Sequence, residues 1–344
     1  MPTLLKKINR HYYPDKKIHP LPKLVMIEPS SVCNLKCLMC ATQQKTRDSR
    51  FLSFLDFEKI IKQFPVIKEL VFCGIGEPLL NPELFEMVKL AKKRNIRFMN
   101  LITNGKLLTK ENANKIIDSG VDRVQISVHS FSQDVFSKLR NDLPENLENL
   151  KNNIKHLVSL KKGRNNPQII CTAVITKVNL DFLLDFIREA KKLGLDGVEF
   201  FQLTTYNDSL KYLNVSSEST VSFIREAKKL AKKINLEIGF LNGNDYGRCY
   251  QLWNFIMIHA DGMISPCNGI FPFENTGLGN ILSEPLERIW NSENYNSLRE
   301  SLKNNQLKNC RYCEVGYSLE GKNFKWFKNY YLRPIARNIS RANV

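Results

Sequence analysis

The stretch CNLKCLMC, residues 33–40, places three cysteines close together, at Cys33, Cys37 and Cys40. A structural zinc site closes its tetrahedron with four Cys or His ligands, and no histidine stands near this triplet in the sequence. In a [4Fe–4S] cluster each iron needs one outside ligand, usually a thiolate, so three cysteines leave one iron open to another molecule. The spacing therefore favours such a cluster over a zinc site or three unrelated core cysteines.

This spacing of cysteines resembles the signature of the radical SAM superfamily. The resemblance implies that Cys33, Cys37 and Cys40 hold a [4Fe–4S] cluster whose open iron binds the amino and carboxylate groups of S-adenosylmethionine (SAM). It implies reductive cleavage of SAM to a 5′-deoxyadenosyl radical. It also implies an external reductant such as flavodoxin or ferredoxin.

Loops after later strands resemble the same superfamily. In its members a G-x-G-E-P loop supports the amino group of SAM, and this chain has GIGEPLLNP at 74–82. The glycines let the backbone approach a ligand, and Glu77 can accept a hydrogen bond from an ammonium group. Two further features match the superfamily, TNG at 103–105 and Arg140. Taken singly, GIGEPLLNP is also typical of a turn before a helix, TNG of an Asn-Gly turn, and Arg140 of an arginine on a solvated helix face. The resemblance implies SAM contacts at Gly74, Gly76, Glu77, Pro78, Thr103, Asn104, Ser127 and Arg140.

Strand and helix patterns alternate over the first two thirds of the chain. We predict strands at 23–30, 69–74, 96–105, 121–130, 168–176 and 197–203, and helices at 54–64, 81–95, 109–120, 146–160 and 180–194. Asn81 is the expected N-cap of the second helix, and Gly120 caps the third. Strands that alternate with helices form a parallel sheet with right-handed crossovers. The predicted fold is α/β, a partial (β/α)6 TIM-like barrel with its chemistry at the C-terminal strand ends and a small C-terminal twitch-type iron–sulfur domain.

The length of 344 residues suggests about two domains. We predict an N-terminal arm at 1–22, a radical SAM core barrel at 23–235, an auxiliary-cluster domain at 236–320 and a tail at 321–344. No apolar run reaches the length of a membrane span and the N-terminus lacks a secretory h-region, so we expect a cytoplasmic protein. The formal net charge of +17 favours anionic partners: a small-molecule substrate with phosphate groups, nucleic acid or an anionic membrane face. No RNA-binding module is recognisable, so nucleic acid is not an expected partner.

Four further cysteines, Cys249, Cys267, Cys310 and Cys313, lie in the last third of the chain. The last two form C-x-x-C, and GMISPC at 262–267 reads G-x4-C. This arrangement resembles the auxiliary-cluster domains called SPASM and twitch. A full SPASM domain has seven cysteines, but none follows Cys313 here, so the resemblance implies one closed auxiliary [4Fe–4S] cluster, the twitch pattern. Spacing alone leaves zinc as the alternative, because four thiolates suit both metals.

His129, Cys73 and Cys171 are the candidate catalytic residues. Relatives often have an acidic residue where this chain has His129, whose near-neutral pKa suits a proton donor or acceptor. A histidine that is hydrogen-bonded at a strand end is the structural alternative. Both cysteines lie on strands, where buried cysteine is common, but one that faces the barrel can give a hydrogen atom to a substrate radical. Polar contacts at the barrel mouth are expected from Lys177, Glu199, Gln202 and Tyr206.

The spacing of the C-terminal cysteines resembles that of the 2-deoxy-scyllo-inosamine dehydrogenases, twitch enzymes that oxidise a cyclitol alcohol. We therefore expect a two-electron oxidation of a small sugar or cyclitol alcohol, with electron transfer to the auxiliary cluster. Radical epimerisation of a sugar and maturation of a ribosomally made peptide are the alternatives. The first strand begins near residue 24, which leaves no room for an N-terminal peptide-recognition domain. A protein that only binds clusters or RNA has no need of Glu77, Ser127 and Arg140.

The tail at 321–344 contains six Lys or Arg residues, five aromatic residues and no acidic residue. A basic amphipathic segment with aromatic residues is typical of contact with an anionic membrane surface, which would place the protein at the membrane periphery. A helix docked on the barrel with solvated arginines is the alternative, and we favour it.

Overall fold

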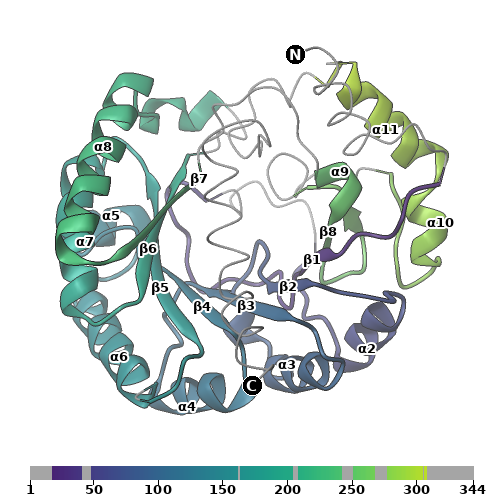
Figure 1. Cartoon of the computed structure of the whole chain (residues 1–344), viewed down its shortest axis with the longest axis horizontal. Coiled ribbons are helices and arrows are strands. Elements are labelled where there is room, and N and C mark those ends of the chain that lie inside the picture. The colour runs from purple at the N-terminus through teal and green to yellow at the C-terminus, as the bar shows by residue number, and fades with distance from the viewer. Residues whose placement is uncertain are drawn as a thin grey trace, which may run out of the picture.

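The computed structural model describes residues 18–40, 48–161, 163–203, 208–241, 251–267, 277–304 and 306–307. Its strands form an open arc whose outer side is covered by helices (Figure 1). The chain follows this arc from β1 to β7 and then returns to the edge beside β1. None of the described helices is long and apolar enough to cross a membrane.

One nine-stranded sheet runs through the molecule in the order β7-β6-β5-β4-β3-β2-β1-β8-β9. Neighbouring strands from β7 to β8 are parallel, and β9 is antiparallel to β8. This parallel arc with helices outside it confirms the predicted α/β partial barrel. The strands are β1 (Leu24–Ile27), β2 (Glu69–Phe72), β3 (Phe98–Thr103), β4 (Arg123–Ser127), β5 (Gln168–Ile175), β6 (Gly197–Gln202), β7 (Glu237–Leu241), β8 (Phe255–Ile258) and β9 (Ile264–Ser265).

Two parallel strands lie outside the predicted set. β7 pairs with β6, so the sheet continues beyond residue 235, where we expected the barrel to end. β8 pairs with β1 at the opposite edge, with Leu24 opposite Phe255. Both strands are too short, at five and four residues, for a clear periodic signal. The C-terminal segment therefore shares the sheet of the barrel.

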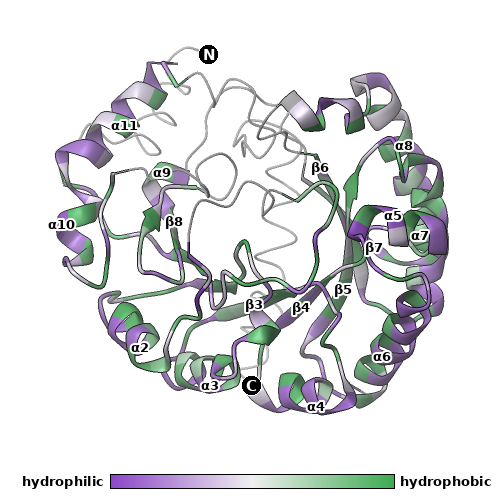
Figure 2. Cartoon of the chain, turned by 180° about the vertical axis from the view of Figure 1, so that it is seen from behind, coloured by the Kyte–Doolittle hydropathy of each residue, from purple (hydrophilic) through white to green (hydrophobic). Residues whose placement is uncertain are grey.

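Helices connect the strands and bury one apolar side against the sheet. In α2 this side holds Phe57, Ile60 and Ile61, at helical spacing. Figure 2 shows hydrophobic and hydrophilic residues together on the surrounding helices, as this arrangement requires. The helices are α2 (Phe54–Lys62), α3 (Leu84–Lys93), α4 (Lys110–Ser119), α5 (Gln133–Arg140), α6 (Asn146–Leu160), α7 (Leu183–Lys192), α8 (Ser217–Ile234), α9 (Gln251–Asn254), α10 (Leu286–Trp290) and α11 (Glu293–Lys303), with 3-10 turns η2 (Pro78–Leu80), η3 (Leu180–Phe182) and η4 (Asp208–Leu213).

Helix α3 begins at Leu84, three residues after the predicted start at 81. The predicted N-cap, Asn81, is buried, and its Nδ2 donates hydrogen bonds to the carbonyls of Pro29 (2.7 Å) and Leu52 (2.8 Å). Asn81 therefore ties the loop before α3 to the segment after β1, and the helix starts beyond it. The other predicted cap is confirmed, because Gly120 ends α4 in the left-handed region at φ = 78°.

The two faces of the sheet carry different clusters. Alternate strand residues point to opposite faces, and in β1 Val25 and Ile27 join the large core between strands and helices. On the other face, Met26 joins a smaller group that we call the inner cluster. Its buried members are Met26, Val71, Phe255 and Met257.

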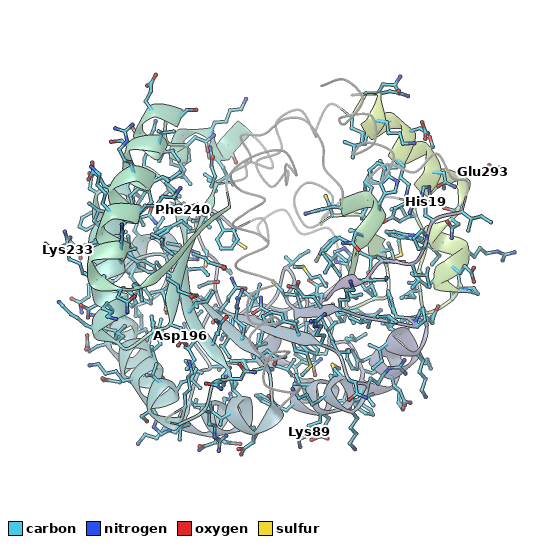
Figure 3. The ribbon with its side chains drawn as sticks, in the orientation of Figure 1. His19, Lys89, Asp196, Lys233, Phe240 and Glu293 are labelled. Atoms are coloured by element: carbon cyan, nitrogen blue, oxygen red, sulfur yellow. The ribbon has the colours of Figure 1, made fainter. Side chains whose placement is uncertain are left out.

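Aromatic contacts join β7 to the rest of the barrel. The ring of Phe240, labelled in Figure 3, stacks on Phe200 of β6 with the ring centres 5.5 Å apart. Phe200 also meets Phe223 of α8 edge to face at 5.0 Å. These contacts anchor the last strand of the arc to its neighbouring strand and helix.

Candidate active site

The loop that follows β1 holds the cysteine triplet and rests on α5. Leu38 donates its backbone N–H to the carbonyl of Leu139 (2.8 Å), and Cys40 donates to the carbonyl of Cys37 (3.0 Å). The loop also packs its own apolar side chains on this helix. The buried cluster there consists of Met39, Val135, Leu139, Leu203, Leu210 and Leu213, with Cys37 and Leu38 packed against it.

The thiols of Cys33, Cys37 and Cys40 are half-buried and lie near enough to one another for their charges to interact. Burial, and to a smaller extent the neighbouring thiols Cys40 and Cys33, raise the pKa of Cys37 to about 12. Burial also raises the pKa of Cys33. Within the described ranges, no three His, Cys, Asp or Glu side chains surround one point as the ligands of a single metal ion do.

Asn104, in the loop after β3, contacts the cysteine loop. Its Nδ2 donates to Oδ1 of Asn34 (2.8 Å) and lies 3.8 Å from Sγ of Cys33, within reach of an N–H···S hydrogen bond. Its backbone N–H donates to Oε2 of Glu77 (2.6 Å). The TNG turn thus joins the first cysteine of the triplet to the GIGEP loop.

Glu77 is buried, and its carboxylate accepts three hydrogen bonds from the protein. Oε1 accepts from Oγ1 of Thr103 (2.6 Å) and from the backbone N–H of Leu79 (3.0 Å), and Oε2 accepts from Asn104. Burial raises the pKa of this carboxyl, while the three hydrogen bonds lower it. Glu77 also donates its backbone N–H to the carbonyl of Val32 (2.8 Å). Glu77 therefore connects the loops after β1, β2 and β3.

Gly74 and Gly76 are required by contacts within the protein. A Cβ at Gly76 would lie 2.2 Å from the carbonyl oxygen of Ser30 and 2.4 Å from that of Val32. A Cβ at Gly74 would lie 2.3 Å from Cγ of Glu28. These glycines let the GIGEP loop pack on the segment after β1. The approach of a ligand, for which we predicted them, stays a prediction.

Arg140 is the last residue of α5. Its guanidinium is buried, so it does not lie on a solvated helix surface. Its Nη1 donates to the carbonyl of Ser127, and its Cζ lies 4.7 Å from the centre of the Phe136 ring. Oδ2 of Asp142 is 3.9 Å from Nη2. The positive charge lowers the pKa of Cys37 against the effect of burial. Among the described residues, Nε of Arg140 has no hydrogen-bond partner.

Ser127, Thr172 and Glu199 stand opposite one another on β4, β5 and β6. Oγ1 of Thr172 lies 3.5 Å from Oγ of Ser127. Glu199 is fully buried, accepts a hydrogen bond from Nε2 of Gln125, and has Oε1 3.7 Å from Nη1 of Arg123. We expected Glu199 at the mouth of the barrel, but it belongs to a buried polar row at the level of Ser127.

His129 follows β4 in a left-handed backbone conformation, with φ = 67°. Its Nδ1 accepts a hydrogen bond from the backbone N–H of Val174 (3.3 Å), so the proton of the neutral ring resides on Nε2. Burial, and then the charge of Arg140, lower the pKa of the imidazole to about 3. A ring that is neutral at physiological pH suits a hydrogen-bond donor better than the base we had considered.

Cys73 and Cys171 face opposite sides of the sheet. Cys171 is fully buried in the core between strands and helices. Cys73 packs instead against the inner cluster, which contains Met26 and Val71. Burial, and then the charge of Glu28, raise the pKa of Cys73 to about 12. The structure therefore favours Cys73 over Cys171 as a hydrogen-atom donor inside the barrel.

A buried chain of polar side chains, which the sequence pattern did not reveal, links β1 to the β8–β9 hairpin. Oε1 of Glu28 accepts from the backbone N–H of Ile75 (2.7 Å), and Oε2 accepts from that of Ala260 (3.2 Å). Oε2 also lies 3.4 Å from Nδ1 of His259, whose Nε2 is 2.7 Å from Oγ of Ser265. The residues are distant in sequence, so only the pairing of β8 with β1 brings them together.

Cys267 is half-buried just after β9. It lies close enough to Tyr295 of α11 that the charge of the Cys267 thiol, in addition to burial, raises the pKa of the Tyr295 phenol. The other predicted auxiliary ligands, Cys249, Cys310 and Cys313, lie outside the described residues.

The remaining predicted residues lie around the barrel or outside the described chain. Pro78 opens η2, Lys177 is exposed after β5, and Gln202 is half-buried at the end of β6. Tyr206, the tail at 321–344 and most of the N-terminal arm are outside the described residues.

Two parts of the chain match known families. Residues 27–164 match the radical SAM superfamily, and residues 249–314 match SPASM, an iron–sulfur cluster-binding domain. The first match contains the cysteine triplet, Glu77 and Arg140, and the second contains Cys267 and the β8–β9 hairpin.

Several curated proteins are similar along most of their length. The chain is 29% identical, over 85% of its length, to 87% of the tungsten-containing aldehyde ferredoxin oxidoreductase cofactor-modifying protein of Pyrococcus furiosus. It is 26% identical, over 84% of its length, to 95% of the GTP 3′,8-cyclase of Aquifex aeolicus. It is 25% identical, over 86% of its length, to 80% of the PqqA peptide cyclase of Bradyrhizobium diazoefficiens.

Solved structures show the same fold at low identity. SuiB of Streptococcus suis bound to the precursor peptide SuiA matches 92% of this chain and 75% of its own, with a TM-score of 0.65 and 16% identity. BtrN in complex with AdoMet and 2-DOIA matches 86% of this chain and 94% of its own, with a TM-score of 0.51 and 15% identity.

Proposed function

The chain belongs to the radical SAM enzyme superfamily and carries a C-terminal SPASM domain, and on this premise we propose that it oxidises a small polar substrate held inside the barrel. A radical SAM domain binds a [4Fe–4S] cluster with SAM, and a SPASM domain binds auxiliary iron–sulfur clusters. We assign the first cluster to Cys33, Cys37 and Cys40, and one auxiliary cluster to Cys249, Cys267, Cys310 and Cys313.

The described residues fit the first cluster and SAM. Three neighbouring thiols are available, and Asn104 supplies an N–H to the sulfur of Cys33. Arg140 places a buried positive charge beside them and has Nε without a partner among the described residues. A buried N–H of this kind is satisfied by an anionic ligand group, which is what the carboxylate of SAM provides. In our assignment Arg140 holds that carboxylate.

The observation that carries the proposal is the row of Ser127, Thr172 and Glu199, which puts a carboxylate level with a predicted SAM contact. When bound, the cofactors supply a 5′-deoxyadenosyl radical for hydrogen abstraction and an acceptor for one electron. The hydroxyl of Thr172, between the predicted SAM contact and the carboxylate, orients the substrate through a hydrogen bond. Glu199, held by Gln125 and Arg123, accepts the hydroxyl proton that the alcohol loses as it becomes a carbonyl.

The substrate class is proposed from the interior and from the relatives. The polar row suits a sugar or cyclitol, whose hydroxyls pair with hydroxyl and carboxylate groups. The names of two relatives refer to a cofactor and to GTP, both small molecules, and the name of a third refers to a peptide. Maturation of a peptide is therefore the alternative substrate class.

Radical epimerisation is the second candidate reaction, and the orientation of Cys73 favours it. An epimerase returns a hydrogen atom to the substrate radical, commonly from a thiol. Cys73 packs against the inner cluster, whereas Cys171 lies in the core on the opposite face. Among the described residues, Cys73 is therefore our candidate for this donor.

Iron analysis tests the two-cluster assignment. Anaerobically reconstituted chain is expected to hold about eight iron and eight sulfide. Changing Cys33, Cys37 and Cys40 to Ala should remove half of the iron and abolish SAM cleavage. Changing Cys249, Cys267, Cys310 and Cys313 to Ala should remove half of the iron and leave SAM cleavage uncoupled from product. Loss of one zinc and no iron in the second variant would overturn the auxiliary cluster.

Deuterium labelling tests the reaction type. Sugars, aminocyclitols, nucleotides and peptides are screened for compounds that increase 5′-deoxyadenosine formation, and the active compound is turned over in D2O. An oxidising enzyme puts no solvent deuterium on the reacting carbon and keeps its activity in Cys73→Ala, with Cys171→Ala as the matched control. Deuterium in the product together with a Cys73→Ala variant that stalls would replace oxidation by epimerisation.

A further inference from the structure

A buried cluster on α10 and α11 lies beside Cys267. The Cζ of Arg299 is 4.5 Å from the centre of the Trp290 ring and 4.3 Å from that of the Tyr295 ring. Nε of Arg299 donates to the carbonyl of Leu252 (2.9 Å), and Nη1 donates to that of Trp290 (2.8 Å). Trp290, Tyr295 and Arg299 are each at most 1% exposed. The guanidinium is therefore fixed between two aromatic rings and two backbone carbonyls.

The cluster occupies the flank of the molecule next to the β8–β9 hairpin. Figure 1 shows α10 and α11 on the same side of the arc as α9 and β8. In Figure 3 this flank is marked by His19 and by Glu293, the first residue of α11. His19 donates its backbone N–H to Oδ1 of Asn291 (2.6 Å), and Nε1 of Trp290 donates to the carbonyl of Pro20 (2.9 Å). The segment before β1 thus holds the C-terminal end of α10 in place.

Two polar atoms of this cluster, Oη of Tyr295 and Nη2 of Arg299, have no hydrogen-bond partner in the described part of the chain. The two residues are one helical turn apart, so they lie on one face of α11. Buried donors without a partner cost free energy, and native proteins rarely leave them so. Burial lowers the pKa of Arg299 only to about 10, so its guanidinium stays charged at neutral pH. A hydroxyl donor and a charged N–H donor are thus held close together in the core.

The position of Cys267 indicates which group accepts hydrogen bonds from these two donors. The thiol of Cys267 lies close enough to the phenol of Tyr295 for their charges to interact. Cys267 is also one of the residues to which we assign the auxiliary cluster. A cluster with its thiolates and sulfides is anionic and accepts hydrogen bonds at sulfur. Unmatched donors beside a cluster thiolate are the arrangement that such an acceptor requires.

We propose that Tyr295 and Arg299 are positioning residues for the auxiliary iron–sulfur cluster, with Tyr295 Oη–H and Arg299 Nη2–H donating hydrogen bonds to its sulfur atoms. This inference rests on the proposed function, because it presupposes a cluster at Cys267. Hydrogen bonds to the sulfurs and a nearby positive charge stabilise the reduced cluster, which carries the extra electron. The two side chains therefore raise its reduction potential and make it a better acceptor for an electron from the substrate.

The test is a redox titration of full-length chain in which Cys33, Cys37 and Cys40 are Ala, so that only the auxiliary cluster gives a signal. The reduced cluster is followed by electron paramagnetic resonance. Tyr295→Phe keeps the ring between Trp290 and Arg299 and removes only the hydroxyl. We expect it to lower the ratio of reduced to oxidised cluster at fixed potential about tenfold, which is about 59 mV for a one-electron couple.

Two further measurements separate this role from a merely structural one. Tyr212→Phe changes an exposed tyrosine and is expected to leave the midpoint potential unchanged. After exchange into D2O, pulsed electron–nuclear resonance of the chain with Tyr295 intact should detect an exchangeable deuteron coupled to the cluster. Tyr295→Phe should lose that coupling. Arg299→Lys keeps the charge but not the planar fork, and it should also lower the potential.

The outcomes distinguish this inference from the assignment on which it rests. If the background variant holds no iron, the auxiliary cluster itself is overturned, and the inference with it. If it holds about four iron, as one [4Fe–4S] cluster requires, and Tyr295→Phe leaves the potential unchanged, only the role of Tyr295 and Arg299 is overturned. Absence of an exchangeable deuteron near the cluster when Tyr295 is intact would likewise overturn the role of Tyr295 and Arg299. This measurement needs no substitution in α11, so it does not depend on whether such a variant folds.

Discussion

The carboxylate of Glu28 and the imidazole of His259 lie 3.4 Å apart, from Oε2 to Nδ1, as a buried pair between the beginning of the barrel and its C-terminal hairpin. The same carboxylate accepts hydrogen bonds from the backbone of Ile75, in the GIGEP loop, and of Ala260. Because His259 lies within the region that matches SPASM, one side chain joins the two cluster-binding parts of the chain. A disturbance of either part is expected to reach the other through Glu28.

Replacement of Glu28 should destabilise the fold. In Glu28→Ala the backbone N–H groups of Ile75 and Ala260 lose their partner, at a cost of about 1–3 kcal/mol for each buried donor. We expect the free energy of unfolding of the chain without clusters to fall by about 2–6 kcal/mol, measured by urea denaturation. Glu86→Ala is the control, because Glu86 forms an exposed pair with Lys89 whose loss costs about 0.5 kcal/mol or less. Equal losses in the two variants would contradict the structural role of Glu28.

A methyl group at Gly76 should displace the GIGEP loop. Its Cβ would lie within 2.4 Å of two carbonyl oxygens, of Ser30 and Val32, so the backbone on one side has to move. We expect Gly76→Ala to bind SAM at least tenfold more weakly, roughly 1.4 kcal/mol, as measured by equilibrium dialysis of the reconstituted protein.

Gly163→Ala is the matched control for this change. A Cβ there meets no atom within 4 Å, although φ is +75° and costs about 1–2 kcal/mol of backbone strain. Stability should fall slightly, and SAM binding should stay as in the parent chain. Normal SAM affinity in Gly76→Ala would show that the loop tolerates the methyl group.

Loss of the carboxylate at Glu199 should separate SAM cleavage from substrate oxidation. Glu199→Gln keeps the size of the side chain but cannot take up a proton, so product formation should fall about 10²-fold or more. SAM cleavage to 5′-deoxyadenosine should continue, and both products are quantified by mass spectrometry. Glu226→Gln changes an exposed carboxylate on α8 and should behave as the parent. Product formation at the parental rate in Glu199→Gln would remove Glu199 from the mechanism.

The titration of His129 should appear in the acid stability of the protein. Its folded-state pKa of about 3 is below the ordinary value, so between the two values the unfolded chain binds more protons. The stability that His129 contributes is therefore complete above about pH 6.5 and is lost as the pH falls toward 3. We expect His129→Gln to flatten the decline in unfolding free energy between pH 7 and pH 5.

Magnetic resonance of the imidazole nitrogens checks the same point directly. At pH 6 the ring of His129 should be neutral, with its proton on Nε2, because Nδ1 accepts from the N–H of Val174. The groups that face the ring include Arg140, whose charge disfavours the imidazolium. A protonated ring at pH 6 would show that the barrel interior does not exclude the charge.

The features that sequence predicts are those with a local cause. The spacing of Cys33, Cys37 and Cys40 is a local property, and the six strands from β1 to β6 each carry a compact apolar run followed by a turn. Gly120 ends its helix at the expected residue because only local backbone geometry is involved. Asn81 differs in part. Its Oδ1 accepts from the backbone N–H of Glu83 (2.8 Å), as a cap does, but its Nδ2 bonds to the distant Pro29 and Leu52, and α3 begins only at Leu84.

The features that sequence misses depend on contacts between distant segments. Cys171 lies in QIICTAVI, where apolar residues occupy both faces of a buried parallel strand, so alternation does not show which face is inside. Glu28 and His259 become neighbours only because β8 pairs with β1. Glutamate is a residue type that mostly lies at the surface, and only the register of Glu199 with Thr172 and Ser127 places it in a buried row.

The pairing of β1 with β8 has a consequence for how the chain is made. β1 leaves the ribosome before the other described strands, yet its second neighbour, β8, is the eighth of them to be synthesised. Until residues 255–258 emerge, the row of N–H and C=O groups on that side of β1 is unpaired. An open edge of this kind recruits strands from other chains. Messages truncated before β8 should therefore yield aggregating fragments, and a chaperone that shields strand edges should act on the nascent protein until β8 is synthesised.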